Sequence, residues 1–485
     1  MKKVFIGSLV LAILHSVLFF GQKLGASVTL YTVSIIFFII NTLEENEKIK
    51  NKKPLILSVP IILLSMTYFI FNSPFFYFWN IVVMIILFAI MMVLSIFEET
   101  KMNKIIYQFF CMLGKPFEKI DKVIDIIIYQ VFDSEKYNVN QKDNNIRKRI
   151  ILGVVVSVPI LAVILLLLSS ADSIFAKGIE GVTSAIGQMF KHITIPELLL
   201  RVGLIIIMTV YVMSVIYHLM DNKEEKEDEE DQRPKIKFDN IIANTVLTIL
   251  NIIYIIFCYI QIVNLFMGYT DLPQTEYADY ARKGFFQLMA VSIINLIIIL
   301  ITIHNHEETS ISQQNYTKIM NLLLAIFTFI ILMSSFMRMY LYEQAFGYTF
   351  LRLMVYVILI TEAILMIPTI MHIFNKDISL VKPYFIIIVT MYVIINYINI
   401  DNMIAKKNID KYLSEINQEE RSIDFKYLKT TGIDGTMQIK RLLNVDDENL
   451  IQDVKKYLQG KYNETEKMNI PEFNINKYCV QKLYL

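Results

Sequence analysis

Long apolar runs separated by short polar segments recur along most of the chain. Most of these runs reach the roughly 18 to 20 residues that an α-helix needs to cross a bilayer. Inside lipid a helix satisfies all of its backbone polar groups within one segment, so a helix is the expected form of each run. The pattern predicts eleven membrane-spanning helices, over residues 4–20, 25–43, 54–71, 75–97, 148–168, 197–220, 239–266, 281–303, 316–338, 349–373 and 382–399.

The first apolar run has two interpretations. It follows Met1-Lys2-Lys3, and a cleavage point near Ala26 would give it the form of a signal peptide. A retained first span is the favoured interpretation. The reason is that the next apolar run follows at once and no secreted domain comes after it.

Three other segments are expected to lie outside the hydrocarbon. Residues 103–132 and 171–195 place apolar side chains at spacings of three and four, which is typical of helices that lie on a membrane surface. We expect the first on the inner surface and the second on the outer surface, as a surface helix or a lid. Residues 221–231 have the sequence DNKEEKEDEED and are expected to form a solvated linker.

These elements divide the chain into four parts. The predicted fold class is an all-α polytopic integral membrane helix bundle with a small soluble helical tail. The parts are a four-span unit at 1–100, a cytoplasmic interfacial helix and loop at 101–147, a seven-span core at 148–399 and the C-terminal tail at 400–485.

Lysine and arginine residues predict the orientation of the spans. If the N-terminus is cytoplasmic, the inner segments carry roughly three times as many of these residues as the outer segments, with the tail left out of the comparison. An odd number of spans then places the tail outside the cytoplasm. We expect a bacterial plasma-membrane protein that contacts the lipid bilayer, with another membrane or envelope protein as an open alternative partner.

Composition narrows the function further. Hydrophobic residues make up 55% of the 485 residues, and a net charge of +1 gives no field that would attract nucleic acid. Cys111, Cys258 and Cys479 are far apart, so they predict neither a disulfide framework nor a metal motif. His304 and His306 are better explained as solvated loop residues than as metal ligands. No HExxH motif, Walker loop, GxSxG motif or kinase signature occurs, so we expect no cofactor and favour a non-enzymatic role.

One ionisable residue is expected near the middle of a span. Glu362 lies about 13 residues into the run that begins near Thr349, and a charge at that depth costs roughly 3 kcal/mol unless it is protonated or paired. Two interpretations stay open: a proton or cation site, or a neutral carboxyl group that hydrogen-bonds between helices. Amide side chains in two earlier spans are expected to join helices by hydrogen bonds, as packing rather than as a pore: Asn251, Gln261, Asn264 and Asn295.

Charged residues of both signs gather at the predicted outer ends of spans and in the outer segments. They can form a polar chamber that binds a ligand, or a structural belt of ion pairs in which arginines reach the interface. The belt is the favoured interpretation. Together with Glu362, the candidate ligand-binding or coupling residues are Asp172, Arg201, Asp279, Arg282, Arg338, Glu343 and Arg352.

The stretch YADYARKGFFQL, residues 277–288, mixes charges and aromatic rings at the predicted outer edge of the bundle. A helix through it places Asp279 against Arg282 and Lys283. Other distinctive pieces follow in order: Ser170-Ala171-Asp172, Phe175-Ala176, Gly284-Phe285-Phe286, Arg338 with Tyr342, Gly347-Tyr348-Thr349 with Arg352, Asn399 with Asp401, Ile404-Ala405 with Asn408, and Asp424 with Tyr427-Leu428. In these pieces, from about residue 150 to 445, the chain resembles a bacterial multi-pass membrane family known as the domain-of-unknown-function 4173 family. The resemblance implies a membrane protein without an established activity, so it assigns no catalytic residue.

Three functional hypotheses follow. The first is a non-enzymatic envelope protein that binds a partner or senses a ligand at its outer face, where the distinctive polar residues gather. The second is a secondary transporter or ion-coupled permease that uses Glu362. The third, a membrane-embedded enzyme with Asp279 or Asp172 as acid or base, ranks last because no nucleophile or metal set accompanies these residues.

Overall fold

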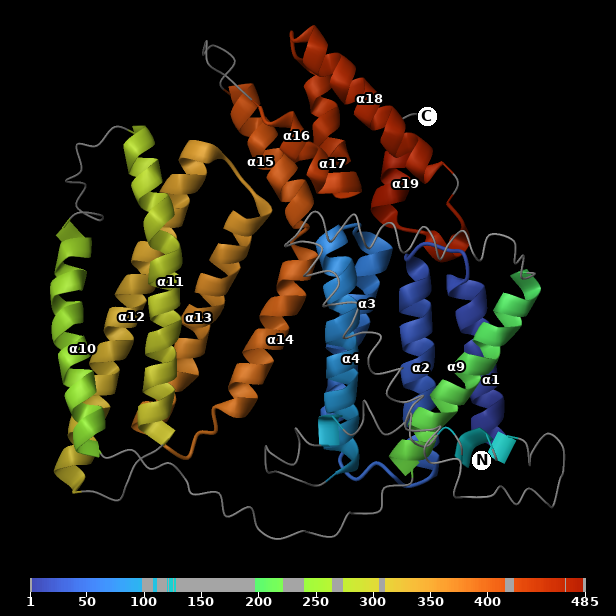
Figure 1. Ribbon diagram of the computed structural model, residues 1–485, viewed down its shortest axis with the longest axis horizontal. Helices are drawn as coiled ribbons and strands as arrows, with labels where there is room; N and C mark the ends of the chain where they lie inside the picture. The colour runs from blue at the N-terminus through green and yellow to red at the C-terminus, as the bar shows by residue number, and fades with distance from the viewer. Residues whose placement is uncertain are drawn as a thin grey trace, which may run out of the picture. The chain divides into compact units, whose positions relative to one another are not determined.

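The computed structural model describes residues 2–97, a few positions between 108 and 127, and then 197–220, 240–263, 274–304, 310–414, 423–466 and 468–482 (Figure 1). Within these ranges the secondary structure is helical, with no strand. The chain divides into two compact units, which are described separately. Unit 1 comprises residues 1–69, 81–225 and 469–473, and unit 2 comprises 70–80, 226–468 and 474–485.

Unit 1 contains the first membrane helices. Helix α1 packs against both α2 and α9. Ser8, Ala12 and Ser16 of α1 and Ser27 of α2 are buried in these contacts, because small side chains let helices in a membrane approach closely. The helices of this unit are α1 (Lys2–Phe19), α2 (Ala26–Glu45), α3 (Ser58–Ile70, preceded by a 3₁₀ turn at Lys53–Leu57), α4 (Pro74–Ile96, whose first residues belong to unit 2) and α9 (Glu197–Met220).

The membrane part of unit 2 is built around one long helix, α12. It packs against α10, α11 and α13, and α13 packs against α14. One apolar cluster, centred on Ile299, Leu324 and Met366, fills the half of the bundle far from the tail, and a second, centred on Phe285 and Met339, fills the other half. The helices are α10 (Asn240–Gln261), α11 (Gln274–His304), α12 (Ile311–Phe346), α13 (Phe350–Phe374) and α14 (Val381–Tyr397).

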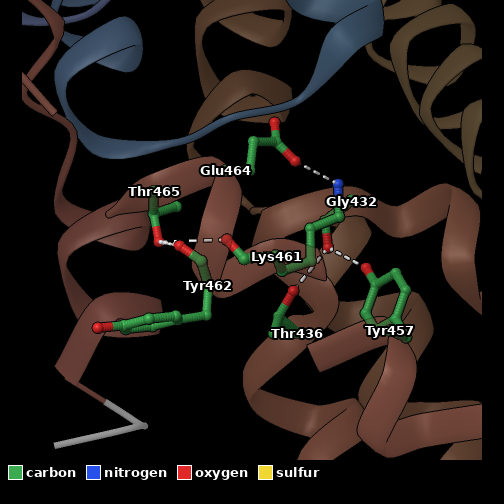
Figure 2. Close-up of polar contacts among 7 residues, drawn as sticks. All are labelled: Gly432, Thr436, Tyr457, Lys461, Tyr462, Glu464 and Thr465. Carbon is green, nitrogen blue, oxygen red and sulfur yellow. Dashed lines mark hydrogen bonds and ion pairs between the residues drawn. The ribbon is translucent and has the colours of Figure 1, made fainter. Parts of the chain in front are cut away.

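The C-terminal tail is a small helical domain of unit 2 with its own apolar core. Ile409, Leu428, Ile439 and Val454 are at most 1% exposed in that core. The hydroxyl groups of Tyr457 and Thr436 both donate to the carbonyl oxygen of Gly432, at 2.8 and 3.0 Å, which ties α18 to the start of α17 (Figure 2). The tail helices are α15 (Ile400–Ser414), α16 (Phe425–Leu428), α17 (Gly432–Ile439), α18 (Glu448–Thr465) and α19 (Ile475–Lys482).

A sharp break separates the last membrane helix from the tail. Asn399 adopts a left-handed conformation with φ of 51°, and α14 and α15 meet at an angle of 54°. Asparagine tolerates this region of backbone space better than most residues. Ala405, Ile409 and Tyr412 of α15 belong to the core of the tail. We therefore assign α15 to the soluble tail and end the membrane span at α14.

The structure confirms the predicted all-α polytopic helix bundle. Among the described residues, nine helices are long and apolar enough to cross a membrane, and the bent pair α14–α15 raises this number to ten. These ten coincide with ten of the eleven predicted spans. The eleventh predicted span, 148–168, lies outside the described residues, as do the surface segment 171–195, the acidic segment 221–231 and most of 103–132. The four domain boundaries stay predictions.

Candidate functional site

The charged residues predicted at the outer face do not gather at a single site in the described structure. Arg201 lies in unit 1, where its guanidinium group contacts Glu197 at 2.8 Å and the ring of Phe20 at 4.7 Å. Because the Arg201 side chain is 41% exposed, this pair is expected to add little to stability. Asp172 lies outside the described residues. Asp279 and Arg282 lie in the first turns of α11, and their side chains are outside the described part of the chain.

Arg338 lies buried between α10, α11 and α12, with 5% exposure. Its Nη2 atom donates to Oε1 of Gln261 at 3.1 Å, and the hydroxyl group of Ser334 donates to the same oxygen at 2.7 Å. The guanidinium group crosses α11 at Gly284. A Cβ atom built on Gly284 would lie only 2.1 Å from Nη1 of Arg338. The glycine that follows the YADYARK sequence therefore provides the space in which a buried arginine reaches the end of α10.

Replacing Gly284 by alanine should displace the Arg338 guanidinium group and weaken its hydrogen bond to Gln261. A buried hydrogen bond to a charged group contributes roughly 1.5 to 3 kcal/mol, so we expect a lower melting temperature for the purified protein in detergent. Gly203→Ala is the matched control. Gly203 is also helical, and nothing lies within 4 Å of its Cβ position. Equal melting temperatures for the two variants would contradict this account of Gly284.

Glu343 and Arg352 lie at the turn between α12 and α13. The Glu343 side chain is 4% exposed, and its Oε2 atom has no hydrogen-bond partner among the described residues. Burial, and then the neighbouring Glu343, raise the pKa of Tyr348 to about 12. Arg352 donates from Nη1 to the carbonyl oxygens of Phe346, at 2.9 Å, and Gly347. Arg352 thus caps the C-terminal carbonyl groups of α12, an arrangement that complements the helix dipole.

The tail holds this same turn through paired hydrogen bonds. The side-chain amide of Asn408 accepts from the backbone N–H of Tyr348 and donates to its carbonyl oxygen, both at 2.8 Å. The Tyr427 hydroxyl group accepts from the N–H of Phe350 at 2.8 Å. Gly347 has φ of 77° and would place a Cβ atom 2.6 Å from the Asn408 amide oxygen, so a side chain at this position would disrupt the contact.

A second attachment of the tail was missed by the sequence analysis. We call it the turn clasp: Asp401, Asp434, Asn474 and Asn476 around residues 71–73. The two carboxylate oxygens of Asp434 accept from the backbone N–H of Asn72 at 2.8 and 2.9 Å. Asn476 donates to Asp434 Oδ1 at 2.8 Å, and Asn474 donates to the carbonyl oxygen of Phe71 at 2.7 Å. Three tail segments therefore hold one short turn before α4.

The two carboxyl groups of the turn clasp are both buried, at 7% exposure for Asp401 and 3% for Asp434. Burial raises the pKa of Asp401 to about 6; the nearby charge of Asp434 also raises it, while a hydrogen bond with the Ser73 side chain lowers it. Burial likewise raises the pKa of Asp434, against the hydrogen bonds from Asn476 and Asn72 and the charge of Lys477. Asp401 is therefore a group that can change its charge near neutral pH.

Glu362 lies in the middle of α13 and is 4% exposed. The hydroxyl group of Ser292, on α11, donates to its Oε2 atom at 3.0 Å. The other oxygen, Oε1, is buried without a hydrogen-bond partner among the described residues. An ionised carboxylate held by one neutral hydroxyl group is poorly stabilised in such surroundings. These surroundings therefore favour the neutral form of the carboxyl group.

No set of three or more histidine, cysteine, aspartate or glutamate side chains is placed to hold a metal ion in the described ranges. His304 is the last residue of α11, and the position of its side chain is not described; His306 lies outside the described residues. The described interior of unit 2 does offer buried carboxyl groups, amides and hydroxyl groups. They can exchange protons and form hydrogen bonds.

Comparison with known proteins gives one family. No match was found among curated proteins, and none among solved structures. Residues 58–442 match a family described as a domain of unknown function, DUF4153. This is a different family from the 4173 family that the sequence pieces resemble, and the narrower resemblance to that family stays a prediction. Because the match covers most of the chain, the protein belongs to the DUF4153 family of uncharacterised domains.

Proposed function

We propose that this membrane protein couples the movement of an ion to its function, as a secondary transporter or permease, with Glu362 as the coupling site. One observation carries the proposal: a carboxyl group in the middle of a spanning helix is 4% exposed and leaves one oxygen without a hydrogen bond. Ionisable residues at this depth are costly, and they commonly mark ion pathways and proton relays. A purely structural carboxyl group would be expected to have both oxygens satisfied.

The test is ion movement by purified protein in lipid vesicles. Proton uptake into vesicles with an internal pH-sensitive dye is measured after a membrane potential, negative inside, is imposed. We expect uptake above that of empty vesicles for the unchanged protein, and uptake equal to that of empty vesicles for Glu362→Gln. The amide has nearly the same size and shape but cannot carry the proton.

The matched control is Glu197→Gln, which neutralises an exposed carboxylate at the start of another spanning helix, α9. It should behave like the unchanged protein. Equal proton uptake by the unchanged protein and Glu362→Gln, with both folded by circular dichroism, would remove Glu362 as the coupling site. Sodium-loaded vesicles with a sodium indicator give the same comparison for a metal cation.

A second candidate is the binding of a partner or ligand at the face that carries the tail. The specific observation in its favour is that the tail is a folded domain, held to the turns at 71–73 and 347–350 by buried polar contacts. Under this proposal the protein lies in a bacterial plasma membrane, and the tail faces the outside, as the distribution of lysine and arginine predicts.

The side of the tail can be tested with Cys479, which lies in α19 and is partly exposed. A maleimide that does not cross membranes should label Cys479 in intact cells, because the predicted orientation places the tail outside. Cys479→Ser is the control and should lose that labelling. Labelling that needs prior lysis would place the tail in the cytoplasm and move the search for a partner to cytosolic proteins.

A further inference from the structure

Four asparagines form a line through the interior of unit 2, and we call them the polar seam: Asn244 and Asn251 on α10, Asn295 on α11, and Asn321 on α12. Asn251, Asn295 and Asn321 are at most 3% exposed, and Asn244 is partly buried. Amide groups at such positions are unfavourable in a membrane interior unless they are hydrogen-bonded. Their partners show which way the line runs.

The seam begins at the end of the bundle where α10 and α12 start. The hydroxyl group of Thr317 donates to Oδ1 of Asn244 at 2.7 Å. One turn further along α12, Oδ1 of Asn321 accepts from the hydroxyl group of Thr302 at 2.8 Å. Asn244 also lines a surface pocket of about 320 Å³ on α10, which reaches Tyr316. The first asparagine of the seam is therefore accessible from the surface of the bundle.

The seam continues on α10 past an apolar section of α12. Leu324 and Ala325, both fully buried, follow Asn321 on α12. On α10 at this level, Asn251 donates to the carbonyl oxygen of Met320 at 3.0 Å. The Oδ1 atom of Asn251 is buried and has no hydrogen-bond partner among the described residues. An unpaired oxygen of the interior thus lies between the pocket and Glu362.

The last part of the seam reaches Glu362. Tyr254, one turn beyond Asn251, donates its hydroxyl proton to Oδ1 of Asn295 at 2.7 Å. The amide nitrogen of Asn295 donates to the Thr328 hydroxyl group at 3.2 Å. Ser292 lies three residues before Asn295 on α11, hence on the same face, and it is the residue that donates to Glu362.

On the side of the tail, the packing next to Glu362 includes an apolar cluster. Phe285, Leu332, Met339, Val355 and Leu359 form this buried cluster, and each is at most 4% exposed. Such a cluster contains no group that could hydrogen-bond a proton carrier. The hydrogen bond that the structure gives Glu362, from Ser292, thus connects it to the polar seam.

From this arrangement we infer that Glu362 exchanges protons through the polar seam with the membrane face at which α10 and α12 begin. This inference deepens the proposed function, because it names the ion and its route. Metal cations are held by several oxygen ligands, whereas the described contacts of Glu362 provide one carboxyl group and one hydroxyl group. A proton requires only the carboxyl group.

Other ionisable groups share the interior of the bundle with Glu362. They are Tyr254 and Cys258 on α10, Arg338 and Glu343 on α12, and Tyr356 on α13. Arg338 and Glu343 lie at the tail end, beyond the apolar cluster, and Tyr356 is part of the border of that cluster. Among these groups, Glu362 is therefore the carboxyl group in the middle of the bundle.

The experiment measures which side of the membrane controls the protonation of Glu362. A lipid-soluble carbodiimide reacts with protonated carboxyl groups in apolar surroundings, and mass spectrometry counts the adduct on Glu362. The protein, with Cys111 replaced by serine, is reconstituted in vesicles, and those whose Cys479 is reachable from outside are captured with an impermeant biotin maleimide. In these vesicles the tail faces outward. We expect alkaline internal pH to reduce the adduct strongly and alkaline external pH to leave it unchanged.

Variants then test the seam itself. Asn295→Leu should slow the response of the adduct to internal pH, because it removes the amide between Tyr254 and Thr328. Asn396→Leu is the matched control: Asn396 is also a buried asparagine of a membrane helix, but it lies on α14 and pairs with Asn80. It should leave the response unchanged. The inference would be overturned if the amount of adduct changed with the external pH, alone or together with the internal pH. An unaltered response to internal pH in Asn295→Leu would also overturn it.

The outcome is separable from that of the proposed function. If the amount of adduct depends on internal pH but the vesicle assay shows no proton uptake, the route is supported and the proposed transport function is rejected. If proton uptake depends on Glu362 but the amount of adduct depends on external pH, the proposed function is supported and the route through the polar seam is rejected. The response of the adduct to internal and external pH in the unchanged protein is enough to separate the two outcomes. The distinction therefore holds even if a seam variant fails to fold.

Discussion

Replacing Asp434 by alanine should release the tail from the turn at residues 71–73. The change removes the acceptor for the Asn72 N–H and the Asn476 amide, both in a buried place, and it leaves the nearby charge of Lys477 without the carboxylate. Hydrogen bonds to a charged group contribute roughly 1.5 to 3 kcal/mol each, and an unpaired buried donor adds its own cost. We expect the attachment of the tail to lose about 3 kcal/mol.

Hydrogen exchange in the full-length protein measures this loss. A loss of about 3 kcal/mol corresponds to roughly hundredfold faster exchange for amides that are protected only while the tail is attached. The affected peptides should be those of residues 71–76 and of α19, because both lie in the turn clasp. Asp453→Ala is the control, since Asp453 is exposed on α18. Unchanged exchange in Asp434→Ala would mean that the clasp does not hold the tail.

The helical spans could be predicted from the sequence because a bilayer imposes one length and one type of backbone hydrogen bonding. For α13 the predicted range, 349–373, differs from Phe350–Phe374 by one residue at each end. For α12 the prediction, 316–338, is too short for Ile311–Phe346. The helix continues beyond Arg338, the last residue of the predicted span, through Glu343, and the fold buries both side chains.

The candidate site was predictable only in part. Glu362 stands out in the sequence because it interrupts an apolar run, and the structure places it in the interior of the bundle, although its role is untested. The turn clasp could not be predicted, because it joins Asn72 to Asp434 across 362 residues of sequence. The pattern of residues in a single sequence indicates helices, strands and helix caps, but it contains no information on contacts between distant residues. The one local signal was the Asn72-Ser73-Pro74 turn between two spans.

The pairing of Arg338 with Gly284 shows the same limit. The sequence singled out the stretch 277–288 for its charges and aromatic rings, whereas the structure gives Gly284 within it a role, as the place where a buried guanidinium group crosses α11. The hydrogen bonds of Arg201 and Arg352 are local, with acceptors four to six residues away, and neither arginine needs a ligand to explain it. The structural interpretation of these two arginines is thus the simpler one.

The attachment of the tail should weaken as the pH rises through about 6, and Asp401 is the group responsible. Its carboxyl group has an ordinary pKa of 3.8, and burial raises the folded value to about 6. For a carboxyl group whose folded pKa is the higher one, the stabilisation is complete below about 3.8 and is lost as the pH passes about 6. The difference between the two pKa values corresponds to about 3 kcal/mol of stabilisation. Roughly half of this stabilisation is lost between pH 5 and pH 8.

Asp401→Asn should remove the part of this pH dependence that comes from Asp401, because the amide stays neutral at every pH. At pH 8 its tail should exchange hydrogen more slowly than that of the unchanged protein, since the charged carboxylate no longer faces Asp434 and Tyr427 in a buried place. The sign is the test: Asp434→Ala should speed the exchange of the tail, and Asp401→Asn should slow it, although both remove a carboxylate from the same clasp. Faster exchange in Asp401→Asn at pH 8 would show that the ionised form of Asp401 stabilises the clasp and would contradict the effect of burial argued here.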